Sequence, residues 1–420
     1  MTEKQVSNFK KKALKYASSF EACCYLDSHN YQDKYGKHDC LIAFGTEREL
    51  VAATGNAFTS LKSFVNENKD WMFGLFTYDL KGEIEDIPDS KTDKLNFPDL
   101  YFFIPDNLIA IKNDEIQVLK GGSDILQKIE NINLGSDSAT LEIKIAPKFT
   151  REEYISSVNK IKQHIKRGDI YEMNFCQEFF SENAYVDPLS VYHKLTAISP
   201  TPFAGFFKIG GKYILSATPE RFLSKRGNIL TSQPIKGTAK RSQNQSEDLQ
   251  IKVELQNSKK EQAENVMIVD LVRNDLTKSA VKGTVKVDEL FGIYTFPQVH
   301  QMISSISCEL SPDVHFIDAI KNTFPMGSMT GAPKLRAMQL INKYERSKRG
   351  AYSGSFGYID PSGDFDFNVV IRSILYNTDT AYLSFQVGGA ITYESDAEKE
   401  YEECLVKASA IMKVLTEVLG

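Results

Sequence analysis

The sequence predicts an α+β fold in which β-sheets are sandwiched between helices. Short runs of β-branched and aromatic residues alternate with segments of helical periodicity, without the regular strand–helix–strand repeat of a doubly wound fold. At 420 residues with a hydrophobic fraction of 42%, the chain can bury a large core in two lobes or in one interlocked fold. A soluble globular protein is therefore expected.

We divide the chain into an N-terminal segment, residues 1–145, and a larger C-terminal segment, residues 146–420, which carries the candidate catalytic groups. The boundary is placed there because residues 112–148 turn polar and rich in glycine and serine, as seams between segments often are. Strands of the first segment are expected where β-branched and aromatic residues dominate, at Ala22–Leu26, Cys40–Phe44 and Trp71–Tyr78.

Two capping boxes predict the starts of helices in the C-terminal segment. Thr150 and Glu153 can satisfy each other's free backbone donors, apolar residues then recur at helical spacing, and Gly168 ends the helix. Ser395 and Glu398 open the last helix in the same way, and it is expected to continue nearly to the end of the chain. Further helices are expected from about Glu247 to Leu271 and from Pro333 onward, and strands at Glu172–Phe179, Phe203–Ile209, Lys212–Ser216 and Phe222–Ser224.

The composition excludes several classes of protein. The net charge of −5 and the absence of a basic cluster mixed with aromatic residues argue against nucleic-acid binding. Six scattered cysteines lack metal-ligand or redox spacing, so reduced buried thiols are expected. No signal peptide is recognisable, and no apolar run approaches the length of about 20 residues that crosses a bilayer. A cytoplasmic protein is expected.

Two pairs of glutamates suggest a metal site. Glu261 and Glu264 lie three residues apart on one predicted helix, and Glu400 and Glu403 repeat the spacing on the last helix. Such spacing puts both carboxylates of a pair on one helical face, and four carboxylates could hold Mg²⁺ while leaving positions for water and substrate. From spacing alone, solvated surface charge is the commoner interpretation. Lys407 follows one turn after Glu403 and could orient that carboxylate.

Glycine-rich turns and a few polar residues indicate an anionic ligand. Glycine lets backbone donors approach an anion closely, and one of these turns leads into a helix N-terminus. Arg372, expected in a strand over Phe367–Leu375, could clamp a carboxylate, and Tyr352 could donate a hydroxyl. His300 is, by itself, more often a satisfied core residue than a catalyst. The turns are Pro234–Thr238, Gly327–Pro333, Tyr352–Gly354 and Gly388–Gly389.

Taken together, these segments resemble the chorismate-utilising enzymes, the family of the anthranilate, aminodeoxychorismate, isochorismate and salicylate synthases. Weaker similarity continues into the N-terminal segment, which resembles the N-terminal region of anthranilate synthase component I, so the resemblance covers nearly the whole chain. The matching blocks are Gly168–Asn174, Thr218–Phe222, Pro234–Thr238, Ala263–Asp275, Phe324–Met338, Arg349–Tyr352 and Ser395–Lys407.

The resemblance implies the fold of that family and a role for each candidate residue. The glutamate pairs match an acidic Mg²⁺ site that bridges the ring carboxylate of chorismate. Tyr352 and Arg372 match the residues that hold the enolpyruvyl carboxylate, and His300 matches a histidine beside the ring. The other implied substrate contacts are Gly237, Thr238, Gly327, Ser328, Gly388, Gly389 and Lys407.

Two positions divide the family. Where isochorismate and salicylate synthases place a general-base lysine, this chain has Glu172, so activation of water for attack on C2 is not provided. Anthranilate synthases carry alanine where this chain has Lys236, and its Pro-Ile-Lys-Gly-Thr stretch resembles the aminodeoxychorismate synthases. There the lysine amine attacks C2, an acid matched by Glu220 helps the 4-hydroxyl leave, and ammonia adds at C4.

The resemblance also implies partners. No segment resembles a glutamine amidotransferase or the lyase that releases 4-aminobenzoate, so ammonia from glutamine implies a partner subunit in a heterodimer of the folate branch. The rival interpretations are anthranilate synthase component I and a catalytically silent chorismate-binding protein.

Three departures from the family pattern stand out. Glu172 replaces the glutamine common among aminating members, and Ala390 replaces a glycine of the carboxylate cradle. Tyr25–Ser28 with Pro202 and Phe203 only partly matches the site where relatives bind tryptophan. Feedback inhibition is therefore not inferred.

Overall fold

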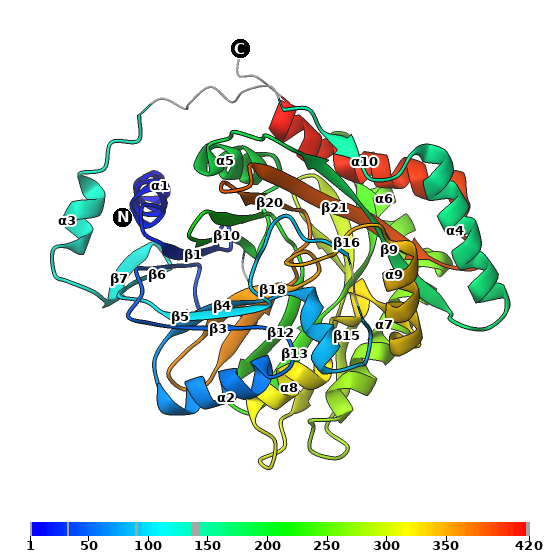
Figure 1. The fold of residues 1–420 in the computed structure, drawn as a ribbon, viewed down its shortest axis with the longest axis horizontal. Helices are drawn as coiled ribbons and strands as arrows, with labels where there is room; N and C mark the ends of the chain where they lie inside the picture. The colour runs from blue at the N-terminus through cyan, green and yellow to red at the C-terminus, as the bar shows by residue number, and fades with distance from the viewer. Residues whose placement is uncertain (1, 32, 89–90, 136–142, 417–420) are drawn as a thin grey trace.

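Two large antiparallel sheets face each other at the centre of the molecule (Figure 1). The structure is a computed structural model that describes residues 2–31, 33–88, 91–135 and 143–416. In spatial order, the first sheet contains β17 (Gly331–Ala332), β9 (Glu172–Ser181), β21 (Tyr382–Ile391), β20 (Ser373–Asn377), β11 (Lys212–Ser216), β10 (Ala204–Ile209), β1 (Ala22–Asp27), β2 (Cys40–Phe44), β6 (Asn107–Lys112) and β7 (Glu115–Lys120), with β8 (Ala146–Pro147) paired to β9.

The second sheet lies below the first in Figure 1 and includes the edge strand β15 (Lys286–Thr295) on β16. Its remaining strands, in spatial order, are β14 (Ile235–Lys240), β16 (Val299–Glu309), β13 (Ile229–Gln233), β12 (Arg221–Arg226), β19 (Phe365–Asn368), β18 (Ser355–Ile359), β4 (Met72–Phe76), β5 (Leu100–Ile104) and β3 (Arg48–Ala52).

Aromatic side chains fill the space between the sheets. Phe207 of the first sheet packs its ring against Tyr101, Phe103 and Phe356 of the second, with centroids 5.7–6.4 Å apart. Alternate residues of a strand point to opposite faces, so each sheet presents a second apolar face outward. Helices cover those outer faces, and the predicted α+β sandwich is confirmed.

The helices form two outer layers. One layer packs on the first sheet and shares its apolar cluster, and the other packs on the second sheet, where Phe58 stacks on Phe76. The first layer comprises α1 (Glu3–Ala17), α3 (Ile125–Glu130), α4 (Arg151–Lys166), α5 (Pro188–Ile198), α9 (Lys334–Tyr344) and α10 (Ala397–Thr416). The second comprises α2 (Ala57–Glu67), α7 (Lys259–Thr277) and α8 (Phe316–Thr323), and α6 (Gln245–Asn257) lies beside β14 and β15.

Both predicted segments contribute strands to both sheets. The N-terminal strands β1 and β2 continue the first sheet through the pair β1–β10, and β4 joins the second sheet through the pair β18–β4. The predicted boundary between residues 145 and 146 stays a prediction. Residues 136–142 beside it lie outside the described residues.

Several predicted elements are confirmed. Helix α4 begins with the reciprocal capping box of Thr150 and Glu153 and is followed by Gly168 at φ +80°. The strand predictions over Cys40–Phe44 and Lys212–Ser216 match β2 and β11 residue for residue. These elements were predictable because their signals are local.

The predicted continuous helix from Glu247 to Leu271 is wrong. The chain leaves the helical conformation at Ser258, at ψ 111°, and divides into α6 and α7. The Ser258 side chain accepts a hydrogen bond from the Glu261 backbone and so caps α7. Serine within a helical pattern competes for backbone donors, and here that competition starts a new helix.

The predicted strand over Phe367–Leu375 is also wrong. Strand β19 ends at Asn368 in the second sheet, and β20 begins at Ser373 in the first. The connecting residues cross from one sheet to the other, and Arg372 has φ +49°. A run of β-branched residues signals extended backbone, but it does not tell which sheet each half joins.

The start of the last helix differs in detail. The Asp396 carboxylate, and not a Ser395–Glu398 box, accepts hydrogen bonds from the backbone of Glu398 and Lys399. The helix extends to Thr416, and residues 417–420 lie outside the described residues. Among the helices that the structure describes, none combines the length and apolar character needed to cross a bilayer.

Candidate functional site

Lys236 lies among three carboxyl side chains from different parts of the fold. Glu172 begins β9, Glu220 precedes β12, and Glu264 lies on α7. Burial raises the pKa of all three carboxyls, and the nearby Lys236 ammonium acts in the opposite direction on each. The tertiary structure therefore brings together the candidate nucleophile and two further candidate site residues, Glu220 and Glu264. We call this region the cleft.

A bulge in β14 sets the position of Lys236. Ile235 pairs with Ile303 and Thr238 pairs with Gln301, so β14 has one more residue than β16 over this interval. Gly237 takes the φ value of +92° that the bulge requires, and a β-carbon there would come within 3.1 Å of Glu261 Oε2. Bulges re-aim side chains, and this one lies at the residue predicted to attack the substrate.

Glu220 has the electrostatics of a general acid. Its side chain is buried, and burial raises the pKa of its carboxyl to about 7, while the charges of Lys236 and Arg372 oppose that rise. A carboxyl with that pKa keeps a substantial protonated fraction at neutral pH. It can therefore give a proton to a leaving hydroxyl.

The two predicted carboxylate-binding residues differ in their surroundings. The guanidinium of Arg372 makes no hydrogen bond with any described residue, and its backbone holds a left-handed conformation that side chains seldom adopt. The Tyr352 hydroxyl is buried and lies 3.3 Å from Cys176 Sγ. The Arg372 guanidinium is thus available to a ligand, and the contact with Cys176 holds the Tyr352 hydroxyl in place.

The turn before α9 provides further polar groups. Gly327 and Ser328 lie in a short 3-10 helix, and the buried Ser328 hydroxyl lies close enough to the Glu220 carboxyl to oppose the rise in its pKa that burial causes. Asn174 on β9 donates to the Ser328 carbonyl at 3.0 Å and fixes this turn. On β14, the Thr238 hydroxyl accepts a hydrogen bond from Gln301 at 3.4 Å.

Gly388 and Gly389 lie where β21 passes β9 and α10. A β-carbon on Gly388 would come within 2.1 Å of the Phe175 carbonyl, so only glycine fits there. Gly389 faces the acidic helix, since a β-carbon there would lie 3.4 Å from Glu400 Oε2. Ala390 pairs with Asn174 in the regular ladder and is not left-handed, so the cost expected from losing a glycine does not arise.

The two glutamate pairs lie around Lys260, the second residue of α7. Lys260 is 3.9 Å from Glu264, and its charge also acts on Glu400 and Glu403 of α10. Burial, with a further contribution from the neighbouring Glu261, raises the pKa of Glu264 to about 7. The pairs therefore carry crowded negative charge, a donor set of the kind that hard cations prefer.

Lys407 connects the acidic helix with the glycine strand. Its ammonium lies 2.8 Å from Glu403 and donates to the Gly388 carbonyl at 2.9 Å. In the described part of the chain, no group of three or more His, Cys, Asp or Glu side chains is already arranged to hold a metal ion. Mg²⁺ stays a prediction: the four carboxylates are donors that a hard cation prefers, and their convergence on an ion would need side-chain movement.

His300 is buried with both ring nitrogens engaged. Its Nε2 lies 3.1 Å from Asp248 of α6, and its Nδ1 lies 3.0 Å from the Thr295 hydroxyl. The backbone of His300 pairs with Ala239, one residue beyond Thr238. The backbone of His300 therefore lies next to the cleft, and hydrogen bonds hold its ring against Asp248 of α6 and Thr295 of β15.

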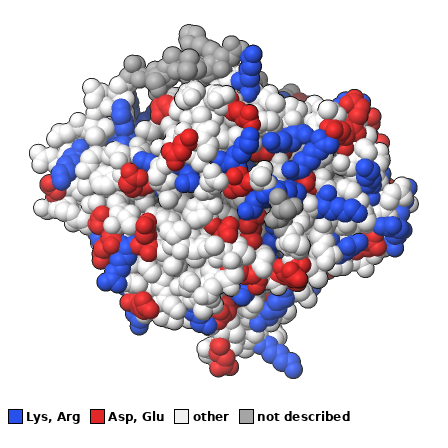
Figure 2. All heavy atoms as spheres, in the orientation of Figure 1, with Lys and Arg blue, Asp and Glu red and all other residues white. Residues whose placement is uncertain are grey.

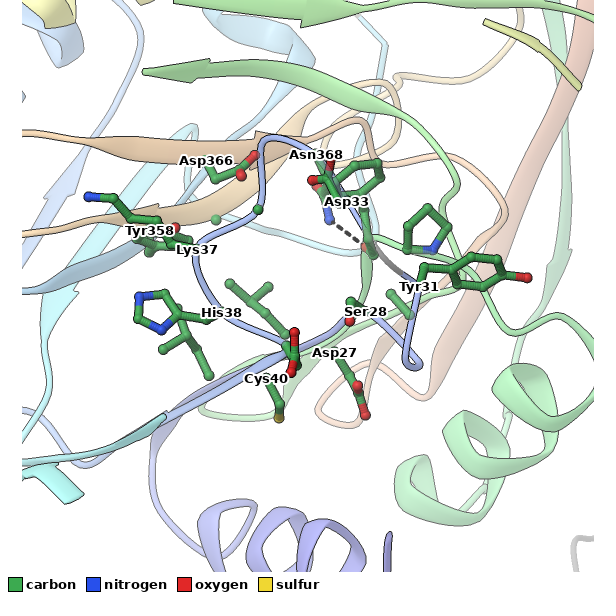
Figure 3. Close-up of a pocket in the computed structure, with 18 of the residues that line it drawn as sticks. Asp27, Ser28, Tyr31, Asp33, Lys37, His38, Cys40, Tyr358, Asp366 and Asn368 are labelled. Carbon is green, nitrogen blue, oxygen red and sulfur yellow. Dashed lines mark hydrogen bonds between the residues drawn. The ribbon is translucent and has the colours of Figure 1, made fainter. Parts of the chain in front are cut away.

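A second, separate cavity of about 70 Å³ lies between the sheets near the N-terminal strands (Figure 3). Ser28, Pro202 and Phe203, which the sequence analysis had singled out, are among its lining residues. The charges around it are paired: Arg221 binds Asp366 through two hydrogen bonds of 2.8 and 2.9 Å and also binds Asp33. We call this region the N-terminal pocket.

The sequence did not single out Arg221, Asn174 or Cys176. Asn174 and Cys176 follow Glu172 at intervals of two on β9, and this spacing puts all three on one face of the strand. That spacing is the signal from which they could have been found. On the face shown in Figure 2, positive and negative side chains are interspersed.

Comparison with known proteins identifies relatives over most of the chain. The family described as chorismate binding enzymes matches residues 21–413. An anthranilate synthase component I-like protein from Synechocystis is 35% identical over 354 residues, which are 82% of this chain and 72% of the relative. Aminodeoxychorismate synthase component 1 from Escherichia coli is 34% identical over 347 residues, 81% of this chain and 76% of the relative.

Solved structures share the fold. Anthranilate synthase component I from Streptococcus pneumoniae superposes with a TM-score of 0.78 at 24% identity, covering 91% of this chain and 93% of that one. The menaquinone-specific isochorismate synthase MenF from Escherichia coli gives a TM-score of 0.77 at 16% identity, covering 96% and 91%. At these identities the likeness concerns the fold alone.

Proposed function

The chain belongs to the chorismate-binding enzyme family, and we propose that it adds ammonia to C4 of chorismate, giving 4-amino-4-deoxychorismate for the synthesis of 4-aminobenzoate and folate. The observation that carries this proposal is the placement of Lys236 on a bulge among buried carboxyls. An amine in that position is a nucleophile, and the carboxyls around it can move protons.

Relatives support the same reaction. Component 1 of aminodeoxychorismate synthase from Escherichia coli and from Bacillus subtilis are 34% and 31% identical to this chain. Relatives named for anthranilate synthase are about as similar, for example the one from Acetivibrio thermocellus at 31%. Overall identity therefore does not choose between amination at C4 and at C2, and Lys236 is the residue that favours C4 in this proposal.

The first step forms a bond to the enzyme. The Lys236 amine attacks C2 of the ring, the ring double bonds shift, and the C4–O bond breaks. Glu220 gives its proton to the departing hydroxyl, which leaves as water. Its raised pKa keeps that proton available at neutral pH.

The second step releases the product. Ammonia attacks C4, the double bonds shift back, and the C2–N bond to Lys236 breaks. Arg372, with its unengaged guanidinium, is proposed to hold the enolpyruvyl carboxylate together with Tyr352. Ser328 and Thr238, with the glycines around them, are proposed to hold the ring carboxylate, and the buried Ser328 hydroxyl supplies a donor.

Mg²⁺ is the proposed cofactor, held by Glu261, Glu264, Glu400 and Glu403. When bound, it would neutralise the ring carboxylate and the crowded carboxylates of α7 and α10. Lys407 orients Glu403 at 2.8 Å, and Lys260 lies where its ammonium balances the same charges.

A partner subunit is proposed to supply ammonia. The relatives named component 1 bear the name of one part of an assembly, and the chain has no recognised amidotransferase segment. We therefore expect the purified chain to use ammonium salts, and to use glutamine only after a glutamine amidotransferase subunit is added. Robust use of glutamine by the chain alone would contradict this proposal.

One assay tests the function. Chorismate, Mg²⁺ and ammonium are incubated with the purified chain, and the products are separated by chromatography. We expect 4-amino-4-deoxychorismate, which added lyase converts to 4-aminobenzoate. Anthranilate as the main product would favour the C2-aminating activity, and the absence of any turnover would favour a silent binding protein.

A further inference from the structure

Arg349 is a buried arginine to which the proposed mechanism gives no role. It opens the Arg349–Tyr352 block of the sequence, and its side chain is 1% exposed. Two hydrogen bonds join it to the Glu345 carboxylate, from Nε to Oε2 at 2.9 Å and from Nη2 to Oε1 at 2.6 Å. The Glu345 side chain is 3% exposed, so both charges of this pair are removed from water.

Stability alone is a weak reason for a buried ion pair. The cost of taking both charges out of water can exceed the attraction between them. A planar guanidinium offers something else, because its donors form a rigid fork that fixes the geometry of the groups it binds. The remaining hydrogen bonds of Arg349 therefore show what this pair positions.

Two of those hydrogen bonds join the turn before α9 to strand β9. Nη1 of Arg349 donates to the Met329 carbonyl at 2.6 Å, and Nη2 donates to the Asn174 carbonyl at 3.1 Å. Met329 follows Ser328, whose hydroxyl is a proposed contact of the ring carboxylate. One side chain thus sets the distance between that turn and β9.

The same ion pair holds Tyr352, a proposed contact of the enolpyruvyl carboxylate. Glu345 Oε1 accepts a hydrogen bond from the Cys176 backbone at 2.9 Å, and Cys176 Sγ lies 3.3 Å from the Tyr352 hydroxyl. At its other end, the backbone N–H of Tyr352 donates to the Arg349 carbonyl at 3.0 Å. Both ends of Tyr352 are therefore connected to the Arg349–Glu345 pair.

The guanidinium has no nitrogen left over for the substrate. Besides the contacts already named, Nη1 donates to the Ser353 hydroxyl at 3.3 Å, so all three nitrogens donate to groups of the chain. The ring of Tyr78 lies 4.6 Å from the guanidinium carbon and adds a cation–π contact. Arg349 therefore acts through other residues and does not touch the substrate.

We propose that Arg349, with Glu345, is a positioning residue that sets the Ser328 turn and Tyr352 at the spacing of the two carboxylates of one chorismate molecule. The inference rests on the proposed function to the extent that chorismate is the ligand. Binding groups keep a productive geometry only when neighbouring hydrogen bonds hold them. The hydrogen bonds of this network do not involve Lys236 or Glu220, so it is expected to govern substrate binding more than bond making.

Arg349→Lys tests the proposal. Lysine keeps the charge beside Glu345, but its single ammonium cannot reproduce the rigid fork. The Kd for chorismate, measured by calorimetry with Mg²⁺ and without ammonium, is expected to rise on the order of 10-fold, because small displacements of binding groups are costly. The KM for chorismate should rise with it, and kcat at saturating chorismate should stay within about threefold of the wild type.

Arg226→Lys is the matched control. Arg226 also pairs with a carboxylate, that of Asp366, and donates to the backbone carbonyls of Tyr35 and Phe365 at 3.1 and 2.7 Å. Both lysine variants should unfold at a lower urea concentration than the wild type. Only Arg349→Lys should change the Kd for chorismate, since a merely structural role lowers stability and leaves the affinity of the folded protein unchanged.

Glu345→Gln keeps the test decisive if Arg349→Lys does not fold. Glutamine has the shape of glutamate but only one acceptor oxygen, so the Arg349 fork and the Cys176 N–H cannot both keep their partners. The Kd for chorismate is expected to rise on the order of 3-fold. In a Tyr352→Phe background the same substitution should have a smaller effect, because part of its action passes through the Tyr352 hydroxyl.

Three outcomes would overturn the inference. A wild-type Kd in the folded Arg349→Lys and Glu345→Gln variants would make the network structural only. An equal rise of the Kd in Arg226→Lys would show a general loosening of the fold. A fall in kcat with an unchanged Kd would place Arg349 in the bond-making step. If the wild type binds chorismate and does not aminate C4, the proposed function fails, and the comparison of Kd values still tests Arg349.

Discussion

Glu220 and Arg221 are neighbours in the chain, yet they belong to two regions that differ in whether their buried polar groups are paired within the chain. Glu220 belongs to the cleft, where Oε2 of the buried Glu172 has no hydrogen-bond partner among the described residues and the Arg372 guanidinium faces the charge of Glu220. Arg221 belongs to the N-terminal pocket, where Asp366 and Asp33 both bind its guanidinium.

The difference separates a binding site from a structural network. Unpaired buried groups destabilise the fold, and a ligand that pairs with them recovers that energy as affinity. Paired charges are satisfied within the chain: burial lowers the pKa of Arg221, and the carboxylates of Asp366 and Asp33 raise it above the usual value. The cleft is therefore poised for a ligand, and the charges of the N-terminal pocket mainly hold the chain together.

The largest expected effect concerns Lys236 in the cleft. Lys236→Ala removes the nucleophile and leaves the carboxylate contacts, so C4 amination should fall at least about 10³-fold while chorismate still binds. Lys236→Arg should not rescue, because guanidinium stays protonated. Product analysis and calorimetric binding of chorismate check both statements. Near-normal amination in Lys236→Ala would contradict the proposal that Lys236 is the nucleophile, and the cleft would then not be the site of the chemistry.

Metal removal should have the next largest effect. Excess chelator should abolish turnover, and Mg²⁺ should restore it. Glu264→Ala or Glu403→Ala should lower the rate on the order of 10²-fold, with smaller losses at Glu261 and Glu400. Glu402→Ala, next to Glu403 on an exposed position, is the matched control. Full activity in chelator would show that the carboxylates of α7 and α10 are surface charge.

Arg221→Met should damage stability where the cleft variants damage chemistry. Removing the guanidinium leaves Asp366 and Asp33 with uncompensated charge, so the free energy of unfolding should fall by about 3–5 kcal/mol. Urea unfolding measures this loss. Arg346→Met, which breaks an exposed pair with Glu153, is the control and should cost less than about 1 kcal/mol. An equally small loss for Arg221→Met would remove the contrast between the two regions.

Glu220→Gln should raise the free energy of unfolding, whereas Arg221→Met should lower it. In the folded protein the pKa of Glu220 is about 7, above its usual value, so the folded state keeps a proton that the unfolded state has lost. The contribution of Glu220 to the free energy of unfolding is therefore largest at low pH and is lost as the pH rises through about 7. At about pH 8 in chelator, Glu220→Gln should raise the free energy of unfolding on the order of 1–3 kcal/mol while lowering activity. If Glu220→Gln leaves the free energy of unfolding at pH 8 unchanged, the buried Glu220 carboxyl does not destabilise the folded protein.

The smallest effect is expected at the edge of the N-terminal pocket. Lys37 binds Asp364 and Asp360 at 2.6 and 2.9 Å, but its side chain is 37% exposed. Lys37→Ala should lower the free energy of unfolding by less than about 1 kcal/mol, and less still in high salt. Amination should be unchanged. A large loss of activity would connect this pocket with the chemistry of the cleft.

Local signals in the sequence predicted much of the fold. The capping box of Thr150 and Glu153, the apolar run Cys40–Phe44 and the spacing within each glutamate pair depend on neighbouring residues, and the structure has α4, β2 and the paired carboxylates where these signals lie. The errors occurred where a local signal was ambiguous. Ser258 could lie inside a helix or cap one, and residues 369–372 could extend one strand or join two sheets.

The sequence by itself determined the α+β class, the family resemblance and the choice of Lys236 as the candidate residue for amination at C4, because residue type and spacing are written in the chain. Only the tertiary structure decided that Glu172 lies within range of the Lys236 charge without a hydrogen-bond partner on Oε2, and that Arg221 and not Glu220 lines the N-terminal pocket. The physical reason is that pairing and burial depend on groups far apart in sequence. Glu172 and Lys236 come within range of each other's charge only because two strands from different sheets are brought to one cleft.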